Sequence, residues 1–297
     1  MLVTDQFTNV IYFSDRLENE CPELFHSVVK LQEQGLPVRF FKGGKSMWAR
    51  DYMPIQVRQD YFVAFRYNPS YLNDTEAHKA TITDNAAEIC QSLFGHKINV
   101  LPTDILLDGG NVIKCDNSVV MTDKVLHDNP NYSTSKLIHE LEFLFNSEIV
   151  LIPWDRNEPI YGHADGVMRH VDDSHYLFAK YPDKCYIKEV QSHFSNVKNK
   201  TFYMPSGATI KHQPYQWAYI NYIRTFEYIL FPALSPKADC AEDVCVASQF
   251  RKLFSEYMPE NIIPVYALPS LNKETSMLNT TWLVCMLMAW MFSRIIS

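Results

Sequence analysis

Polar residues that could do chemistry recur along the chain at a nearly constant spacing. They are Asp51 in WARD, Asp108 in LDGG, His163 in GHAD, Asn221 in YIN and Asn279–Thr280 in LNTT. The successive intervals are 57, 55, 58 and 58 residues. Because equivalent positions of a repeat fall on one face or around one axis, we predict that these side chains meet in one pocket.

The residue types indicate the chemistry of such a pocket. Asp51, Asp108 and Asp165 are carboxylates, and converging carboxylates repel one another unless a cation lies between them. A guanidinium suits this place, since its planar set of N–H donors binds carboxylates bidentately. His163 titrates near neutral pH and could carry a proton. Trp48 offers an aromatic face on which a flat cation could pack.

Glycines gather beside these positions. Six of the nine glycines flank them, namely Gly43, Gly44, Gly109, Gly110, Gly162 and Gly166. Glycine permits close approach of the backbone and unusual φ values, which buried polar pockets often need. Hairpin turns that require glycine are the alternative for any one of them, but the clustering favours a site.

The elements that must position these residues repeat as well. Helix-like stretches cover Thr83–Phe94, Ser133–Phe145, Lys184–Phe194 and Ala241–Met258. Strand-like segments ending in proline follow them and read INVLP, EIVLIP, TFYMP and VYALP. Two further strand-like runs follow each of the first three prolines. We therefore predict five units of helix, strand and hairpin that close into a ring, with Tyr67–Ala77 as a surface loop.

Composition excludes several classes of protein. The 297 residues include 34 Asp and Glu against 27 Lys and Arg, a net charge of −7, and 47% are hydrophobic. These values are typical of a globular protein, and without a basic run we expect no nucleic-acid partner. A small cationic substrate fits the charge better.

The cysteines and the chain ends bear on location. Seven cysteines show no zinc-site spacing, and the N-terminus has no basic segment followed by an apolar run. We expect free thiols in a reducing cytoplasm. The eleven apolar residues Trp282–Phe292 are fewer than the 18 or so that a spanning helix needs, so a buried strand or helix is expected and no membrane partner.

The motifs carry a family resemblance. WARDYMP, LDGGNV, GHADGVMR and AYINY resemble the agmatine deiminase and bacterial-type peptidylarginine deiminase family of the guanidino-group-modifying (pentein) superfamily. The resemblance spans Trp48 to Asn279. It implies an α/β fold, a five-bladed pseudo-symmetric propeller of ββαβ-type repeats in a single domain over residues 1–297. It also implies hydrolysis of a guanidino group to a ureido group with loss of ammonia, with no metal and no cofactor.

The resemblance implies roles for individual residues. Asp51 matches the first guanidinium-binding carboxylate, and His163 and Asp165 match the general acid/base and its neighbouring substrate-binding carboxylate. Asn221 matches an active-site asparagine. Asp108 stands where agmatine deiminases usually have Glu and the peptidylarginine-type members have Asp. The expected reaction is agmatine to N-carbamoylputrescine, within polyamine metabolism and putrescine biosynthesis, or an arginine-type substrate to citrulline.

The nucleophile departs from the family pattern. The family uses a cysteine in the fifth unit, but Thr280 stands at that register here. Cys285 lies five residues further on, about 16 Å along an extended strand at about 3.3 Å per residue and on its opposite face. Cys285 is the candidate nucleophile if the chain bends back, and otherwise a buried structural thiol. A non-catalytic relative that binds guanidino compounds is the alternative function.

Two other hypotheses are compatible with the sequence. His163, Asp165 and the nearby His170 could form a metallohydrolase site, although no second His-rich motif supports it. Asp51 taken alone could form a surface ion pair with Arg50 or Arg66. The sequence does not fix the oligomeric state.

Overall fold

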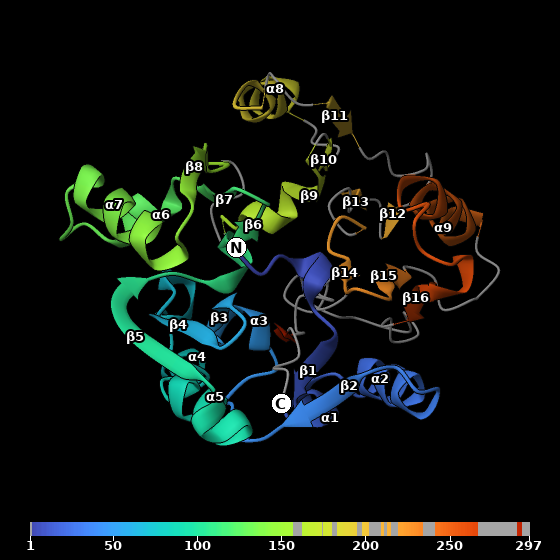
Figure 1. Ribbon diagram of the computed structural model, residues 1–297, viewed down its shortest axis with the longest axis horizontal. Helices are drawn as coiled ribbons and strands as arrows, with labels where there is room; N and C mark the ends of the chain where they lie inside the picture. Colours follow the sequence, from blue (N-terminus) through green and yellow to red (C-terminus); the bar gives the residue numbers. More distant parts are fainter. Residues whose placement is uncertain are drawn as a thin grey trace.

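The computed structural model describes residues 2–156, 162–173, 175–179, 183–194, 198–201, 209–210, 213–214, 219–233, 241–266 and 290–292. Within these residues the strands form five three-stranded sheets and one two-stranded ribbon. Figure 1 shows the five sheets following one another around the middle of the molecule, with helices at the periphery.

The strands of each sheet come from nearby segments of the chain, with one exception. The first sheet contains β17 (Trp290–Phe292), β1 (Val10–Ser14) and β2 (Val38–Phe41). The second contains β3 (Ile55–Arg58), β4 (Tyr61–Arg66) and β5 (Asn99–Leu106), and the third β6 (Ile113–Lys114), β7 (Ser118–Thr122) and β8 (Glu148–Ile152). The fourth contains β9 (Met168–Asp172), β10 (His175–Phe178) and β11 (Lys198–Thr201). The fifth contains β14 (Ile223–Arg224), β15 (Ile229–Ala233) and β16 (Ile262–Tyr266), and the ribbon pairs β12 (Thr209–Ile210) with β13 (Gln213–Pro214).

Helices precede the last strand of each sheet. They are α1 (Leu17–Glu20) and α2 (Pro22–Glu33) before β2, α4 (Glu76–Lys79) and α5 (Ala86–Phe94) before β5, α6 (Lys124–Asp128) and α7 (Thr134–Phe145) before β8, α8 (Lys184–Ser192) before β11, and α9 (Ala241–Leu253) before β16. The short helix α3 (Ala49–Tyr52) lies between β2 and β3. The four helices predicted from the sequence are confirmed as α5, α7, α8 and α9.

All five sheets share one pattern of strand pairing. In each, the first strand is antiparallel to the middle strand, and the middle strand is parallel to the last. The unit is therefore a hairpin followed by a helix and a strand. The predicted order of helix, strand and hairpin grouped these elements wrongly, because the strand after each helix pairs with the preceding hairpin.

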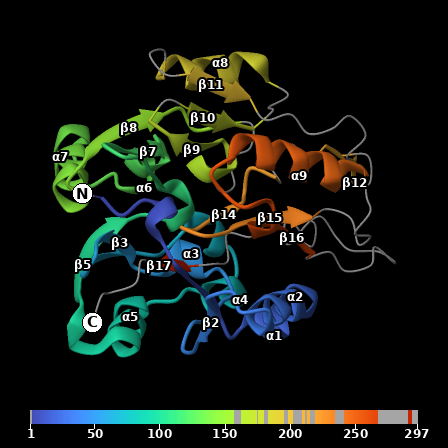
Figure 2. The ribbon, with the colours of Figure 1, turned by 45° about the vertical axis from the view of Figure 1, so that its right-hand side comes forward.

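The first sheet joins the two ends of the described chain. No hairpin precedes β1, and β17 takes the missing place, with Val10 opposite Phe292 (Figures 1 and 2). Residues 290–292 of the apolar run thus form a strand, whereas residues 282–289 lie outside the described residues. Among the described helices, none combines the length and the apolar composition that a membrane crossing requires.

Helix α7 illustrates how helices pack on these sheets. Ser133 caps its N-terminus by accepting the Lys136 N–H, and Asn146 ends it in a left-handed conformation with a φ of 50°. Its buried face repeats at helical spacing through Leu137, Leu141, Leu144 and Phe145. Burying each such side chain contributes about 1.5–3 kcal/mol.

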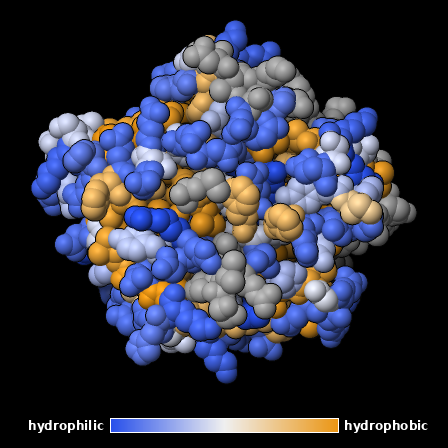
Figure 3. Space-filling view, in the orientation of Figure 1, coloured by the Kyte–Doolittle hydropathy of each residue, from blue (hydrophilic) through white to orange (hydrophobic). Residues whose placement is uncertain are grey.

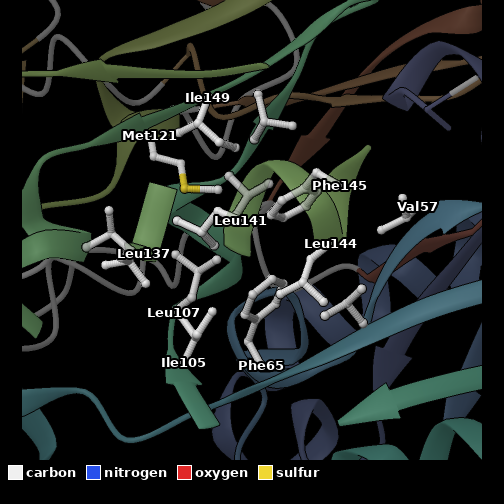
Figure 4. Close-up of a cluster of buried hydrophobic side chains, with 14 of the residues drawn as sticks. Val57, Phe65, Ile105, Leu107, Met121, Leu137, Leu141, Leu144, Phe145 and Ile149 are labelled. Atoms are coloured by element: carbon white, nitrogen blue, oxygen red, sulfur yellow. The ribbon is translucent and has the colours of Figure 1, made fainter. Parts of the chain in front are cut away.

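The cluster around α7 also joins the second and third sheets. Figure 4 shows the α7 side chains against strand residues that include Phe65, Ile105, Met121 and Ile149. These residues come from β4, β5, β7 and β8, so one core fixes both sheets relative to each other. In the face shown in Figure 3, hydrophilic residues cover most of the outer edge, and hydrophobic residues show mainly nearer the middle.

Candidate active site

The motif residues occupy equivalent places just before the first strand of four sheets. Asp51 lies in α3 before β3, Asp108 directly precedes the turn Gly109–Asn111 before β6, His163 directly precedes the turn Ala164–Gly166 before β9, and Asn221 lies two residues before β14. The sequence register therefore corresponds to a structural register. Asn279 and Thr280 lie outside the described residues.

The His163 imidazole lies between two carboxylates. Its Nε2 is 3.0 Å from Asp108 Oδ2, and its Nδ1 is 4.0 Å from Asp51 Oδ1. The side chains of His163, Asp51 and Asp108 are 10%, 8% and 8% exposed. Asp51 Oδ1 also accepts a hydrogen bond of 3.0 Å from the Gly110 N–H. Three residues that are far apart in the sequence thus form one buried cluster.

Glycine is required where the second and third motifs pack. A Cβ at Gly109 would collide with the carbonyl oxygen of Arg50. A Cβ at Gly110 would collide with His163 Nδ1 and lie 2.9 Å from Asp51 Oδ1. These two glycines allow the backbone to approach the site, as predicted.

For two other glycines beside the motifs, a turn that requires glycine is the explanation. Gly43 and Gly162 adopt positive φ values of 97° and 62°, which side-chain-bearing residues rarely adopt. A Cβ at Gly166 would meet nothing within 4 Å, so neither close approach nor a positive φ explains that glycine.

Asp165 is the most buried carboxylate of the group. Its side chain is 1% exposed, and its Oδ2 accepts a hydrogen bond of 3.3 Å from Arg50 Nε. Arg50 therefore pairs with Asp165 rather than with Asp51. Burial raises the pKa of Asp165, although the Arg50 guanidinium opposes the rise. Asp165 was expected to bind the substrate, but one of its oxygens already accepts a hydrogen bond from the Arg50 guanidinium.

Burial and mutual charge set the protonation of the cluster. Burial, with the Asp108 and Asp165 charges adding to it, raises the pKa of Asp51 to about 7 against the opposing effect of His163. Burial lowers the pKa of His163, but the hydrogen bond to Asp108 and the nearby carboxylate charges outweigh this and raise the pKa to about 9. At neutral pH the imidazole is therefore protonated and can donate a proton.

Tyr71 is a site residue that sequence reasoning missed. Its hydroxyl donates a hydrogen bond of 3.3 Å to Asp108 Oδ2, and its ring lies edge-on to the His163 ring at 6.4 Å. The prediction of a surface loop over Tyr67–Ala77 is wrong for this part, since Tyr67 is buried and Tyr71 half-buried. Two tyrosines in an otherwise polar loop were the available signal.

Asn111 is a second residue that was missed. Its Oδ1 accepts hydrogen bonds from the Thr122 N–H at 2.9 Å, the Thr122 hydroxyl at 3.0 Å and the Ala164 N–H at 3.2 Å. This amide ties the Asp108 turn to the His163 turn. The LDGGN motif contains the residue, but spacing alone does not reveal its partners.

Trp48 and Asn221 are the two residues predicted to contact the substrate outside the carboxylate cluster. Trp48 is half-buried and packs against the core cluster that includes Ile11 and Phe13. Asn221 is 2% exposed, and its Oδ1 has no hydrogen-bond partner among the described residues. A buried oxygen of this kind can accept an N–H donor from a ligand.

The nucleophile is not part of the described site. Cys285 lies outside the described residues. Among the thiols that are described, Cys21, Cys90 and Cys115 are buried. Burial raises the pKa of all three thiols, which makes them poor thiolates.

The structure separates the residues of the metallohydrolase hypothesis. His170 Nε2 lies 3.4 Å from Asp116 Oδ2. Within the described part of the chain, the grouping with metal-ligand spacing consists of Asp116, His170 and Asp173. His163 and Asp165 are not in this grouping, so the three residues of that alternative hypothesis do not come together in the described part of the chain.

The fold and the site define the class of protein. Five sheets of one pattern around a buried histidine–carboxylate cluster match solved structures of the pentein fold. Agmatine deiminase of C. jejuni with substrate bound is 12% identical, with a TM-score of 0.70 over 99% of this chain and 96% of that chain. Agmatine deiminase of Enterococcus faecalis is 13% identical, with a TM-score of 0.69 over 99% and 96%. DDAH of Pseudomonas aeruginosa in complex with citrulline is 9% identical, with a TM-score of 0.56 over 96% and 100%.

At these identities the structural likeness shows a shared fold. The sequence itself shows the family: residues 6–276 match the Porphyromonas-type peptidyl-arginine deiminases, and the chain belongs to that family. The resemblance seen in the motifs is thereby confirmed. No curated protein matches the sequence.

Proposed function

We propose that the protein hydrolyses a guanidino group to a ureido group with release of ammonia. The observation that carries this proposal is the buried imidazole of His163 between Asp51 and Asp108, in a chain of the peptidyl-arginine deiminase family. We also propose that residues 1–297 form a single domain in which the five sheets are the blades of a pseudo-symmetric propeller.

The carboxylates would bind the substrate cation. Burial raises the pKa of Asp51 to about 7, and a guanidinium placed beside Asp51 would favour its ionised form. The unpartnered Oδ1 of Asn221 would accept a further guanidinium N–H. Asp165, held by Arg50, would act mainly by its charge, and Trp48 would pack on the substrate only if its side chain turned toward the pocket.

The chemical steps follow from these positions. A thiolate, proposed to be that of Cys285, would attack the guanidinium carbon and form a carbon–sulfur bond. His163, protonated at neutral pH, would give its proton to the departing nitrogen, which leaves as ammonia. The neutral imidazole would then take a proton from water, whose oxygen attacks the same carbon and displaces the thiolate, leaving the ureido product.

The substrate is agmatine or an arginine-type compound. Asp in place of Glu at position 108 favours an arginine-type substrate, and agmatine is the most economical choice for a free small molecule. Conversion of agmatine would yield N-carbamoylputrescine, which connects the proposal to putrescine biosynthesis. Free thiols at Cys21, Cys90, Cys115, Cys185 and Cys245 support a cytoplasmic location.

A binding protein without catalysis is the second candidate. Thr280 at the register of the family's cysteine is the observation that favours it, because a threonine hydroxyl ionises too weakly to replace a thiolate. Such a protein would keep the carboxylate cluster and bind the same guanidino compounds.

One set of assays separates these candidates. Ureido product and ammonia are measured with agmatine, L-arginine and an arginine-containing peptide, and calorimetry measures binding of the same compounds. Catalysis predicts turnover by the wild type, loss of turnover in Cys285→Ala and retention in Cys245→Ala, an exposed control thiol. Binding without turnover favours the second candidate. Neither binding nor turnover with any compound would refute both.

A further inference from the structure

A second set of charged residues follows the same repeat as the motif residues. Lys114, Arg169 and Arg224 lie at successive intervals of 55 residues, in strands β6, β9 and β14. Each occupies the first strand of its sheet. The repeat therefore brings three cations together, and all three line one small pocket.

The cations of this pocket outnumber its carboxylates. Asp5 is the one carboxylate among the described lining residues, and its Oδ2 binds Arg169 Nη2 at 2.9 Å. Lys114 Nζ has a long contact of 3.4 Å with the carbonyl oxygen of Gln56. The pocket lining therefore holds more cations than carboxylates.

Arg224 and His170 each lie against a carboxylate outside the pocket lining, Glu256 and Asp116. Glu256, whose side chain is 55% exposed, pairs with Arg224 at 3.2 Å and offsets its charge, so Lys114 and Arg169 are the cations left against Asp5. His170 lines the pocket, and burial together with the Arg224 charge lowers the pKa of His170 to about 4. At neutral pH this imidazole carries no charge.

Two buried hydroxyls in the pocket lack partners. Tyr222 and Thr4 both line it, and each is 2% exposed. The Tyr222 hydroxyl and Thr4 Oγ1 have no hydrogen-bond partner among the described residues. Leaving a buried polar group unsatisfied costs about 1–3 kcal/mol, so a ligand that accepts hydrogen bonds would stabilise the pocket.

We propose that this pocket binds a small inorganic anion, a halide or an oxyanion, held by Lys114 and Arg169 and by the Tyr222 hydroxyl. The pocket offers the Lys114 ammonium and two hydroxyls without partners among the described residues, and its one carboxylate is already paired, so an anion matches it better than a neutral molecule or a cation. The site is distinct from the His163 cluster.

Ion-dependent stability tests the proposal. The melting temperature and calorimetric binding are measured with sodium chloride and sodium phosphate, with ionic strength held constant by sodium gluconate. We expect chloride, phosphate or both to stabilise the wild type in a saturable way. The salt that does so shows whether the pocket binds a halide or an oxyanion. Lys114→Gln and Tyr222→Phe should each weaken anion binding by at least about tenfold, since hydrogen bonds to charged groups are strong.

Matched variants keep the test decisive. Lys97→Gln removes the same charge from an exposed lysine and should leave anion binding unchanged. Tyr222→Phe keeps the packing of the ring, and circular dichroism checks that it folds. A pocket filled by water alone would give no saturable response in the wild type. That result, or equal responses in wild type and Tyr222→Phe, would overturn the proposal.

Discussion

The buried ion pair of Arg50 and Asp165 offers a direct test of how the candidate site is stabilised. The two side chains are 13% and 1% exposed, and Arg50 Nε lies 3.3 Å from Asp165 Oδ2. Replacing Arg50 by Met keeps an apolar stem but removes the charge. We expect a large loss in the free energy of unfolding, because Asp165 would hold a buried charge without its cation.

Asp165 can respond to the removal of Arg50 in two ways, and the less costly one limits the loss in the free energy of unfolding. If Asp165 stays ionised, the lost attraction at 3.3 Å is about 5 kcal/mol at an effective dielectric constant of about 20. If Asp165 becomes protonated instead, the cost at pH 7 is about 4 kcal/mol relative to an ordinary carboxyl group with a pKa of about 3.9. The cheaper route prevails, so the electrostatic loss is at most about 4 kcal/mol at pH 7 and about 1.5 kcal/mol at pH 5.

Lys45→Met is the matched control. Lys45 and Asp84 form a shorter ion pair of 2.7 Å, but their side chains are 43% and 74% exposed. Its loss is expected to be about 0–1 kcal/mol at either pH. Urea unfolding of the wild type and both variants at pH 5 and pH 7 measures these values. Equal losses in the two variants, or an Arg50→Met loss that does not shrink at pH 5, would refute the reasoning.

Three further predictions concern the same site. Gly110→Ala should cost about 1–3 kcal/mol in urea unfolding, because its Cβ would collide with His163, whereas Gly166→Ala should stay within about 1 kcal/mol of the wild type. Asn111→Ala should cost at least about 2 kcal/mol in the same assay, since three donors lose their acceptor. Stability should fall as pH rises: the folded state holds a proton on Asp51 up to about pH 7 and on His163 up to about pH 9, above their ordinary values of 3.8 and 6.5. Melting temperatures between pH 5 and pH 9 check this, and a flat profile that His163→Asn does not alter would contradict it.

Local patterns predicted the elements well. The helix-like stretch Ser133–Phe145 is a property of one short segment, and helix α7 lies within it. The register of Asp51, Asp108 and His163 was also readable, because a repeat carries equivalent positions along the chain.

Contacts between distant segments could not be read in the same way. The pairing of β17 with β1 joins the two ends of the described chain, and no local pattern encodes it. Arg50 and Asp165 are 115 residues apart, and many carboxylates could have paired with that guanidinium. The sequence did not indicate that Lys114, Arg169 and Arg224 share a pocket, because such side chains are most often solvated.

The two registers are connected through Arg50. Lys114 follows Asp108 by six residues and Arg169 follows His163 by six, so in these two units one stretch supplies an acid or an imidazole and then a cation. Arg50 binds Asp165, and its charge also lowers the pKa values of Asp5 and Lys114 in the pocket. Coulomb interactions between buried groups are weakly screened, so Arg50 attracts Asp5 and repels Lys114, and the carboxylate cluster and the cation pocket are coupled. An anion bound in the pocket would offset part of that positive charge, and the pKa of Asp165 would then rise. Arg50→Met should therefore remove the buried pair with Asp165 and weaken the coupling between the carboxylate cluster and the cation pocket.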